Sequence, residues 1–198
     1  MPQYFDPQPE LAHQAIAYDV EFQGETFTFH SDSGVFSKGG LDDGTRFLLE
    51  TIAKADLGKE ILDLGCGIGP IGLILAHADH SRQVTLADVN PRALECCKKN
   101  AISLGVSEQV RIIQSDVYSH IATSFSTIVT NPPIRAGKKV TYAMYAGAVS
   151  HLNEGGSLIL VIRKQQGAAS CQDYLKTLFQ KVECVAQHKG YRILIATK

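Results

Sequence analysis

The stretch ILDLGCGIGPIG, Ile61 to Gly72, decides the fold of this chain. It opens with the apolar run of a buried strand that ends at Asp63, and glycines follow at positions 65, 67 and 69. Open α/β sheets bind ligands at the carboxyl ends of their strands, where a glycine loop leaves bare backbone within reach. The pattern therefore predicts a strand that runs directly into a ligand-binding loop.

Strand patterns and helix patterns alternate over the rest of the chain. The β-rich runs are EILDLG, QVTLAD, VRIIQSD, STIVTN and SLILVIR, and the clearest helix between them begins at Asn90-Pro91 and stops at Gly105. Strand, helix and strand repeated in this way predict βαβ crossovers and a mostly parallel sheet with helices on both faces. The final runs VECVAQH and YRILIAT are joined only by the dipeptide KG, so the last strand must be antiparallel to its neighbour.

The segment before this alternating region has a different character. Two β-rich runs, AYDVEF and TFTFH, flank Gln23-Gly24-Glu25 and predict a short hairpin. The polar stretch SDSGVFSKGGLDDGT predicts an ordered loop that leads into a helix over about Gly44 to Lys54. Residues 1–16, which hold three prolines, are expected to form an N-terminal arm on the surface.

Length and composition indicate one globular, cytoplasmic domain. The chain has 198 residues, of which 44% are apolar and 20% charged, and no apolar run reaches the roughly 18–20 residues of a membrane span. The cysteine count, five, is odd and no CxxC occurs, so free buried thiols are expected and no metal site is predicted. The net charge of -1 excludes a general basic surface, so that a nucleic acid must be held by a local patch.

The glycine loop allows two kinds of cofactor. Gly67, Gly69 and Gly72 satisfy the GxGxxG pattern, with Asp88 at the end of the next strand, as in a dinucleotide site. Asp63, however, would lie beside the pyrophosphate of a dinucleotide and repel it. An acid at this position suits a ligand with an ammonium group, such as S-adenosylmethionine, whose ribose hydroxyls would bond to the carboxylate of Asp88.

Polar residues also follow the third and fourth strands. After the third strand, Asp116 can accept a hydrogen bond from an adenine amine while the Val117 N–H donates to the ring; a helix N-cap is an equal alternative for Asp116. After the fourth strand, Asn131-Pro132-Pro133 is expected to turn the Pro132 carbonyl, which has no ladder partner, outward beside the Asn131 amide. Two such acceptors would hold a planar NH2 group and align its nitrogen with a reaction partner.

At this point the sequence resembles the class I S-adenosylmethionine-dependent methyltransferases. Within that class it is similar to the small-domain family of ribosomal RNA guanine-N2 methyltransferases, in particular to its single-domain bacterial members. The resemblance extends from about Thr26 to the end and includes SDSGVFSKGGLDDGT, NPPIRAGKK and KGYRIL. It implies a Rossmann-like α/β fold with a seven-stranded sheet, in which residues 17–43 form the hairpin and a cofactor-covering loop and residues 44–198 form the catalytic core.

The resemblance also implies roles for individual residues. Asp63, Gly65 and Gly67 would hold the methionine part of the cofactor, Asp88 the ribose and Asp116 the adenine, while Asn131 and Pro132 would hold the target amine. The full cofactor set is expected to be Asp63, Gly65, Cys66, Gly67, Gly69, Asp88, Val89, Asp116, Val117 and Asn131. We expect Cys66 to be a packing residue, because no base is placed beside it.

The substrate side departs from the family at one position. Many amino-methylating relatives have an aromatic residue directly after NPP to stack on the base, whereas this chain has Ile134. Either Phe36 or Tyr142 would supply the stacking, or apolar contact would replace it. Positive charges near the site could hold RNA phosphates, with Lys189 and Arg192 as further candidates. The expected substrate set is Phe36, Lys38, Pro133, Ile134, Arg135, Lys138 and Lys139.

The first hypothesis is therefore an enzyme that methylates an exocyclic amine, with guanine N2 of ribosomal RNA or of a ribosomal particle as the substrate. A rival within the same class is another planar amine, either adenine N6 or a protein glutamine amide. Two rivals come from other classes: a nicotinamide-dependent oxidoreductase, which leaves Asn131-Pro132-Pro133 unexplained, and a non-catalytic cofactor-binding assembly factor.

Overall fold

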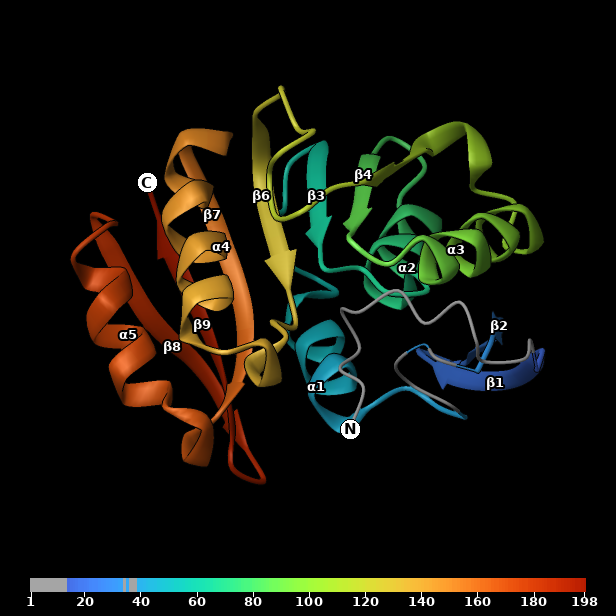
Figure 1. The fold of residues 1–198 in the computed structure, drawn as a ribbon, viewed down its shortest axis with the longest axis horizontal. Helices are drawn as coiled ribbons and strands as arrows, with labels where there is room; N and C mark the ends of the chain where they lie inside the picture. Colours follow the sequence, from blue (N-terminus) through green and yellow to red (C-terminus); the bar gives the residue numbers. More distant parts are fainter. Residues whose placement is uncertain (1–13, 34, 36–38) are drawn as a thin grey trace.

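A seven-stranded sheet forms the centre of the fold (Figure 1). The computed structural model describes residues 14–33, 35 and 39–198. The strands of this sheet are β3 (Glu60–Leu64), β4 (Gln83–Asp88), β5 (Val110–Gln114), β6 (Phe125–Thr130), β7 (Leu152–Arg163), β8 (Lys181–His188) and β9 (Tyr191–Thr197). Their order is β5-β4-β3-β6-β7-β9-β8, and only β9 runs against the others, as expected from the two-residue link that precedes it.

Helices cover both faces of the sheet because successive strand residues point to opposite sides. Ile61 packs among residues of α1 (Asp43–Ile52), α2 (Pro70–Ala78) and α3 (Pro91–Ser103). Its neighbour Leu62 packs among residues of α4 (Lys138–His151) and α5 (Ala168–Lys176) on the other face. The near-continuous apolar runs of the strands are thus those of a sheet buried on both sides, which confirms the expected fold class.

The expected element boundaries need small corrections. Asn90 caps α3 as expected, since its side-chain oxygen accepts from the N–H of Arg92 at 3.0 Å and of Ala93 at 3.4 Å. The first helix spans Asp43–Ile52, whereas the sequence predicted about 44–54. Strand β7 begins at Leu152, five residues before the apolar run that predicted it, because α4 leads directly into it.

A hairpin of β1 (Ile16–Phe22) and β2 (Glu25–Ser31) lies against α3. Its apolar side chains, including Phe27 and Phe29, join the core formed by the first three helices. The fully buried Asn100 of α3 fixes its position: the amide donates to the carbonyls of His30 and Ile68, both at 3.0 Å, and accepts from the His30 N–H at 2.7 Å. One side chain thus ties the hairpin to the glycine loop.

The strands that carry the expected site residues end at one edge of the sheet. The arrows of β3, β4 and β6 point to this carboxyl edge, where the hairpin and the start of α1 lie (Figure 1). Within the described residues, no helix has the length and apolar character that crossing a membrane would require. Most of the expected N-terminal arm, along with Phe36 and Lys38, lies outside the described residues.

Candidate active site

The glycine loop after β3 is open at its start and tightly packed at its far end. Gly65, Gly67 and Gly69 all have positive φ, at 75°, 56° and 93°. A Cβ on Gly69 would lie 2.7 Å from Cys97 Sγ and 2.8 Å from Leu73 Cδ1. A Cβ on Gly65, by contrast, would have only Met144 Cε nearby, at 3.7 Å. The loop therefore presents open backbone at Gly65 while its far end packs closely on the helices.

Asp63 is a buried carboxylate with one unpaired oxygen. Its Oδ2 accepts from the Gly72 N–H at 2.8 Å, whereas the buried Oδ1 has no partner among the described residues. Burial raises the pKa of this carboxyl to about 7, against the lowering effect of the Gly72 bond, and nearby Asp88 raises it further. A buried oxygen without a hydrogen-bond donor destabilises the fold, so a cationic ligand group that donates to it fits this position.

Asp88 lies at the end of β4, and both of its oxygens are already engaged. Oδ2 accepts from the Gly67 N–H and Oδ1 from the Asn90 N–H, both at 2.8 Å. Burial raises the pKa of Asp88, and the backbone N–H groups of Asn90, Gly67 and Val89 oppose that increase. The carboxylate retains acceptor capacity beside these N–H groups, so it can hold a hydroxyl group while it fixes the glycine loop.

Strained backbone marks the end of β5. Val117 has a φ of 52°, a region that β-branched residues rarely adopt, and no described group accepts from its N–H. The side chain of Asp116 beside it is exposed, and the chain here forms a turn in which the Ser119 N–H donates to the Asp116 carbonyl at 3.0 Å. The turn excludes the N-cap alternative for Asp116 and leaves a donor and an acceptor side by side.

The amide of Asn131, directly after β6, is held from one side. Its nitrogen donates to the two oxygens of Asp42, at 3.2 and 3.3 Å, and to Thr45 Oγ1 at 3.0 Å. No described group donates to its oxygen. Asp42 and Thr45 begin α1 and are 89 and 86 residues away in the sequence, which is why reasoning from local patterns missed both.

The Pro132 carbonyl differs from the expectation. It lacks a ladder partner, as expected, but it accepts from the Ile134 N–H at 2.8 Å and is not free. The intervening Pro133 has φ -74° and ψ 77°, the geometry of an inverse γ-turn, which brings these two groups together. The carbonyl retains one acceptor position, so that Asn131 provides the main acceptor at this strand end.

Several other expected site residues have packing roles. Burial, the neighbouring Cys97 and the charges of Asp63 and Asp88 raise the pKa of the buried Cys66 thiol well above its usual value, which disfavours a nucleophilic thiolate. Tyr142 stacks on Tyr174 at 4.2 Å between ring centres, so one face of the Tyr142 ring is covered. The half-buried Ile134 packs against the core beneath α4, and the carbonyl of the half-buried Val89 accepts from Gln114 Nε2 at 3.3 Å.

Charges are separated along the carboxyl edge. Asp63, Asp88 and Asp116 follow β3, β4 and β5, which form one half of the sheet. At the other half, the segments around the ends of β6, β7 and β8 contain positive charges, and the acids Asp42 and Asp43 at the start of α1 lie beside the end of β6. We call the positive residues the basic rim: Arg135, Lys138, Lys139, Arg163, Lys164, Lys189 and Arg192. Lys138 and Lys139 lie in the first turn of α4, where the helix dipole disfavours cations. Arg163 and Lys164 were missed because they end a strand with no motif.

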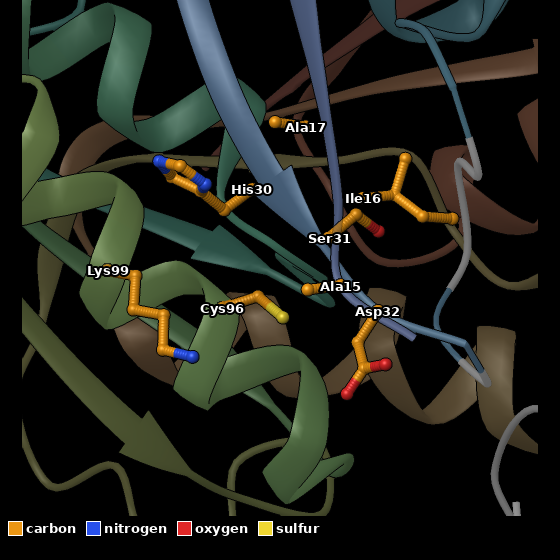
Figure 2. Close-up of a pocket in the computed structure, with 8 residues that line it drawn as sticks. All are labelled: Ala15, Ile16, Ala17, His30, Ser31, Asp32, Cys96 and Lys99. Carbon is orange, nitrogen blue, oxygen red and sulfur yellow. The ribbon is translucent and has the colours of Figure 1, made fainter. Parts of the chain in front are cut away.

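Two cavities lie outside the site formed by these strand ends. The first, of about 210 Å³, lies between the hairpin and α3 and is lined by residues such as His30, Asp32, Cys96 and Lys99 (Figure 2). The second, of about 420 Å³, is at the opposite edge of the sheet, beside Gly58 and Gly156. Neither contains an expected site residue. Among the described residues, no group of three His, Cys, Asp or Glu side chains could hold a metal ion.

Comparisons with known proteins identify relatives over nearly the whole chain. A family model described as "Methyltransferase small domain" matches residues 26–195. The uncharacterized protein YbxB of Bacillus subtilis is 42% identical over 197 residues, 98% of each chain. The ribosomal RNA small subunit methyltransferase C of Serratia proteamaculans is 34% identical over 168 residues, which make up 83% of this chain and 47% of that protein. The chain thus spans about half the length of this rRNA methyltransferase.

Solved structures extend the likeness to three dimensions. The T. thermophilus 16S rRNA N2 methyltransferase RsmC, solved in complex with AdoMet and guanosine, superposes with a TM-score of 0.84 at 27% identity. The match covers 96% of this chain and 52% of that chain. A methyltransferase from Pyrococcus furiosus, at a TM-score of 0.66 and 21% identity, shares the fold. Nearly the whole chain therefore has a counterpart in one solved structure.

Proposed function

Because the chain belongs to the methyltransferase small-domain family, we propose that it methylates the N2 amine of guanine in ribosomal RNA, with S-adenosylmethionine as the methyl donor. The observation that carries this proposal is the amide of Asn131, whose nitrogen is fully engaged by Asp42 and Thr45 and whose oxygen has no described donor. The likeness to RsmC supports the choice of guanine N2.

The cofactor, when bound, supplies an activated methyl group on a sulfonium. The chain offers it matching partners: the unpaired oxygen of Asp63 for the ammonium, the remaining acceptor positions of Asp88 for the ribose, and Asp116 with the Val117 N–H for the adenine. Because these groups stand at the ends of three adjacent strands, they can contact one extended ligand.

The acceptor side then has mainly to align the target. Register pairs Asp63 with Val129, two residues before Asn131, so the amide lies at the next strand end beside the cofactor loop. Its oxygen can accept one hydrogen of the guanine NH2, and the remaining acceptor position of the Pro132 carbonyl can accept the other. Alignment suffices because the methyl group is already activated, and the proton of the methylated amine can pass to water.

The direct test is methyl transfer to RNA from cells that lack this protein. Purified protein is incubated with labelled S-adenosylmethionine and either ribosomal particles or free ribosomal RNA, and the labelled nucleosides are identified by mass spectrometry. We expect N2-methylguanosine. Label in N6-methyladenosine or in protein would favour the same-class rivals instead, and a complete absence of transfer would favour the assembly-factor alternative.

Replacing Asp88 by alanine should weaken binding of S-adenosylhomocysteine by about 1.5–3 kcal/mol, the range for losing hydrogen bonds to a charged group. The variant also releases the Gly67 N–H, so that the glycine loop loses an anchor. Calorimetric titration measures the affinity, with Glu108→Ala as a control that removes an exposed carboxylate from the far edge. Equal affinity for the wild type and Asp88→Ala would show that the ribose is held elsewhere.

The basic rim is proposed to hold RNA phosphates, since none of its seven members forms an ion pair with a described residue. Changing Arg135, Lys138 and Lys139 together to alanine should raise the KM for RNA and leave cofactor affinity unchanged. The slope of log affinity against log salt should fall by up to about 2, at roughly 0.7 per phosphate contact to a single strand.

The matched control for this triple variant changes three exposed lysines at the opposite edge of the sheet. Lys54, Lys59 and Lys176 to alanine alters the net charge by the same amount, but it should leave both the KM and the salt slope as in the wild type. If the two triple variants behave alike, RNA approaches by another face.

A further inference from the structure

The amide of Asn131 has one permitted orientation. Asp42 can only accept hydrogen bonds when ionised, so the nitrogen of the amide must face it, at 3.2 and 3.3 Å. A rotation by 180° would place the amide oxygen against two carboxylate oxygens. The oxygen is therefore kept on the side away from α1, where no described group donates to it.

The partners of the amide are themselves rigid. Asp42 caps α1 by accepting from the N–H groups of Gly44 at 3.0 Å and Thr45 at 3.2 Å. Thr45 is buried, and a Cβ at Gly44 would lie 3.0 Å from the ring of Tyr191, so the first turn of α1 cannot shift easily. The far side of the helix is anchored in the core by Leu48 and Leu49, both fully buried.

The strand end that carries Asn131 is fixed as well. The buried Thr130 donates to the Leu64 carbonyl at 2.7 Å, which ties the end of β6 to the end of β3. The two prolines that follow Asn131 restrict the backbone on its other side. A side chain that remains free to rotate on such a backbone needs an outside partner to select its direction, and α1 provides that partner.

We propose that Asp42 and Thr45 are positioning residues, which turn the Asn131 amide so that its oxygen receives the target amine. This inference rests on the proposed function, because it assigns the orientation of the acceptor in that reaction. It also gives the N-cap of α1 a second role: the residue that caps the helix sets the acceptor.

A reciprocal exchange of the two side chains tests the proposal. Asp42→Asn keeps a good helix cap but lets the amide of residue 42 donate to the Asn131 oxygen, so kcat should fall at least tenfold. Asn131→Asp faces the Asp42 carboxylate with no donor between them, and kcat should fall at least a hundredfold. In the double variant Asp42→Asn with Asn131→Asp, the amide of residue 42 can donate to one carboxylate oxygen of residue 131. The other oxygen of that carboxylate then faces outward and can accept from the target amine.

Rescue in the double variant is the decisive result. Its kcat should exceed that of Asn131→Asp alone at least tenfold, which loss of a merely structural contact cannot produce. A double variant with a kcat less than tenfold above that of Asn131→Asp alone would overturn the proposal. Thr45→Val against Thr45→Ser gives an independent pair: kcat should fall in the valine variant and stay near the wild-type value with serine, and equal values would remove Thr45 from the role.

A measurement without RNA keeps this inference separate from the proposed function. The side-chain NH2 signals of Asn131, identified by their loss in Asn131→Ala, should exchange slowly with solvent in the wild type and at least tenfold faster in Thr45→Val. If the Asn131 NH2 exchanges slowly in the wild type and the protein methylates no RNA, the proposed function is wrong and the orienting contact stands. Fast exchange in the wild type would overturn the orienting contact whatever the substrate.

Discussion

Replacement of Asn131 by alanine is expected to lower kcat for methyl transfer by about 10²-fold or more, which corresponds to about 2.7 kcal/mol in the transition state. In the proposed reaction the amide oxygen is the main acceptor for the target amine, and alignment contributes most when the transition state forms. Cofactor affinity should change by less than about tenfold, because ribose and adenine are held at other strand ends. Single-turnover kinetics and calorimetry measure the two effects separately.

The control for this variant is Asn153→Ala, which removes an exposed amide from β7 at the far edge of the sheet. It should retain wild-type turnover. Turnover in Asn131→Ala that equals the control would remove Asn131 from the mechanism and, with it, the main reason to expect an amine substrate. A large loss of cofactor affinity with an unchanged kcat would assign Asn131 to the cofactor instead.

The pH dependence of stability should carry the signature of Asp63. Its pKa is raised from 3.8 to about 7 in the folded protein, which corresponds to at most about 4 kcal/mol at 1.36 kcal/mol per pKa unit. The folded state holds this proton more tightly than the unfolded chain does. The contribution of Asp63 to the free energy of unfolding is therefore full below about pH 4, falls as the pH rises toward 7, and stays low above it.

Asp63→Asn should remove that dependence. The free energy of unfolding of the variant, minus that of the wild type, should increase between pH 4 and 8, and each kcal/mol should appear as about 2–4 °C in Tm. Thermal unfolding at several pH values measures this difference, with the exposed Glu108→Gln as the control. A difference that does not change with pH would mean that burial does not raise the pKa of Asp63 in the folded protein. The same variant should bind S-adenosylhomocysteine more weakly, because it lacks the carboxylate for the ammonium.

Local patterns in the sequence predicted most of the fold. Apolar runs gave the strands, and Asn90 and Gly105 marked the ends of α3, because each of these signals acts within a few residues. The two-residue link before β9 likewise determined its direction. The sequence did not predict the early start of β7, because LNEGG has no strand pattern. Leu152 is part of the strand because it pairs with Phe125 of β6.

The contacts that complete the site could not be predicted in the same way. The meeting of Asp42 with Asn131 depends on how α1 docks on the sheet, and neither residue type indicates it locally. Reasoning from the sequence alone ranks an aspartate at 131 as less harmful than an alanine, since it also accepts; the Asp42 carboxylate, 3.2 and 3.3 Å from the amide nitrogen, leads us to expect a loss at least as large. The turn that engages the Pro132 carbonyl is likewise visible only in the backbone geometry.

The separation of charge along the carboxyl edge also affects how the molecule meets a polyanion. With a net charge of -1, the whole protein exerts almost no attraction at long range. Within about 10 Å, the Debye length at 0.1 M salt, the edge acts as a dipole whose positive end is the basic rim. We expect an encounter to last longer when the basic rim faces the polyanion, and to be shorter when the carboxylates face it. For the proposed RNA substrate, we expect this dipole to select the orientation of the protein during approach, before any base is contacted, without the indiscriminate binding of a uniformly basic protein.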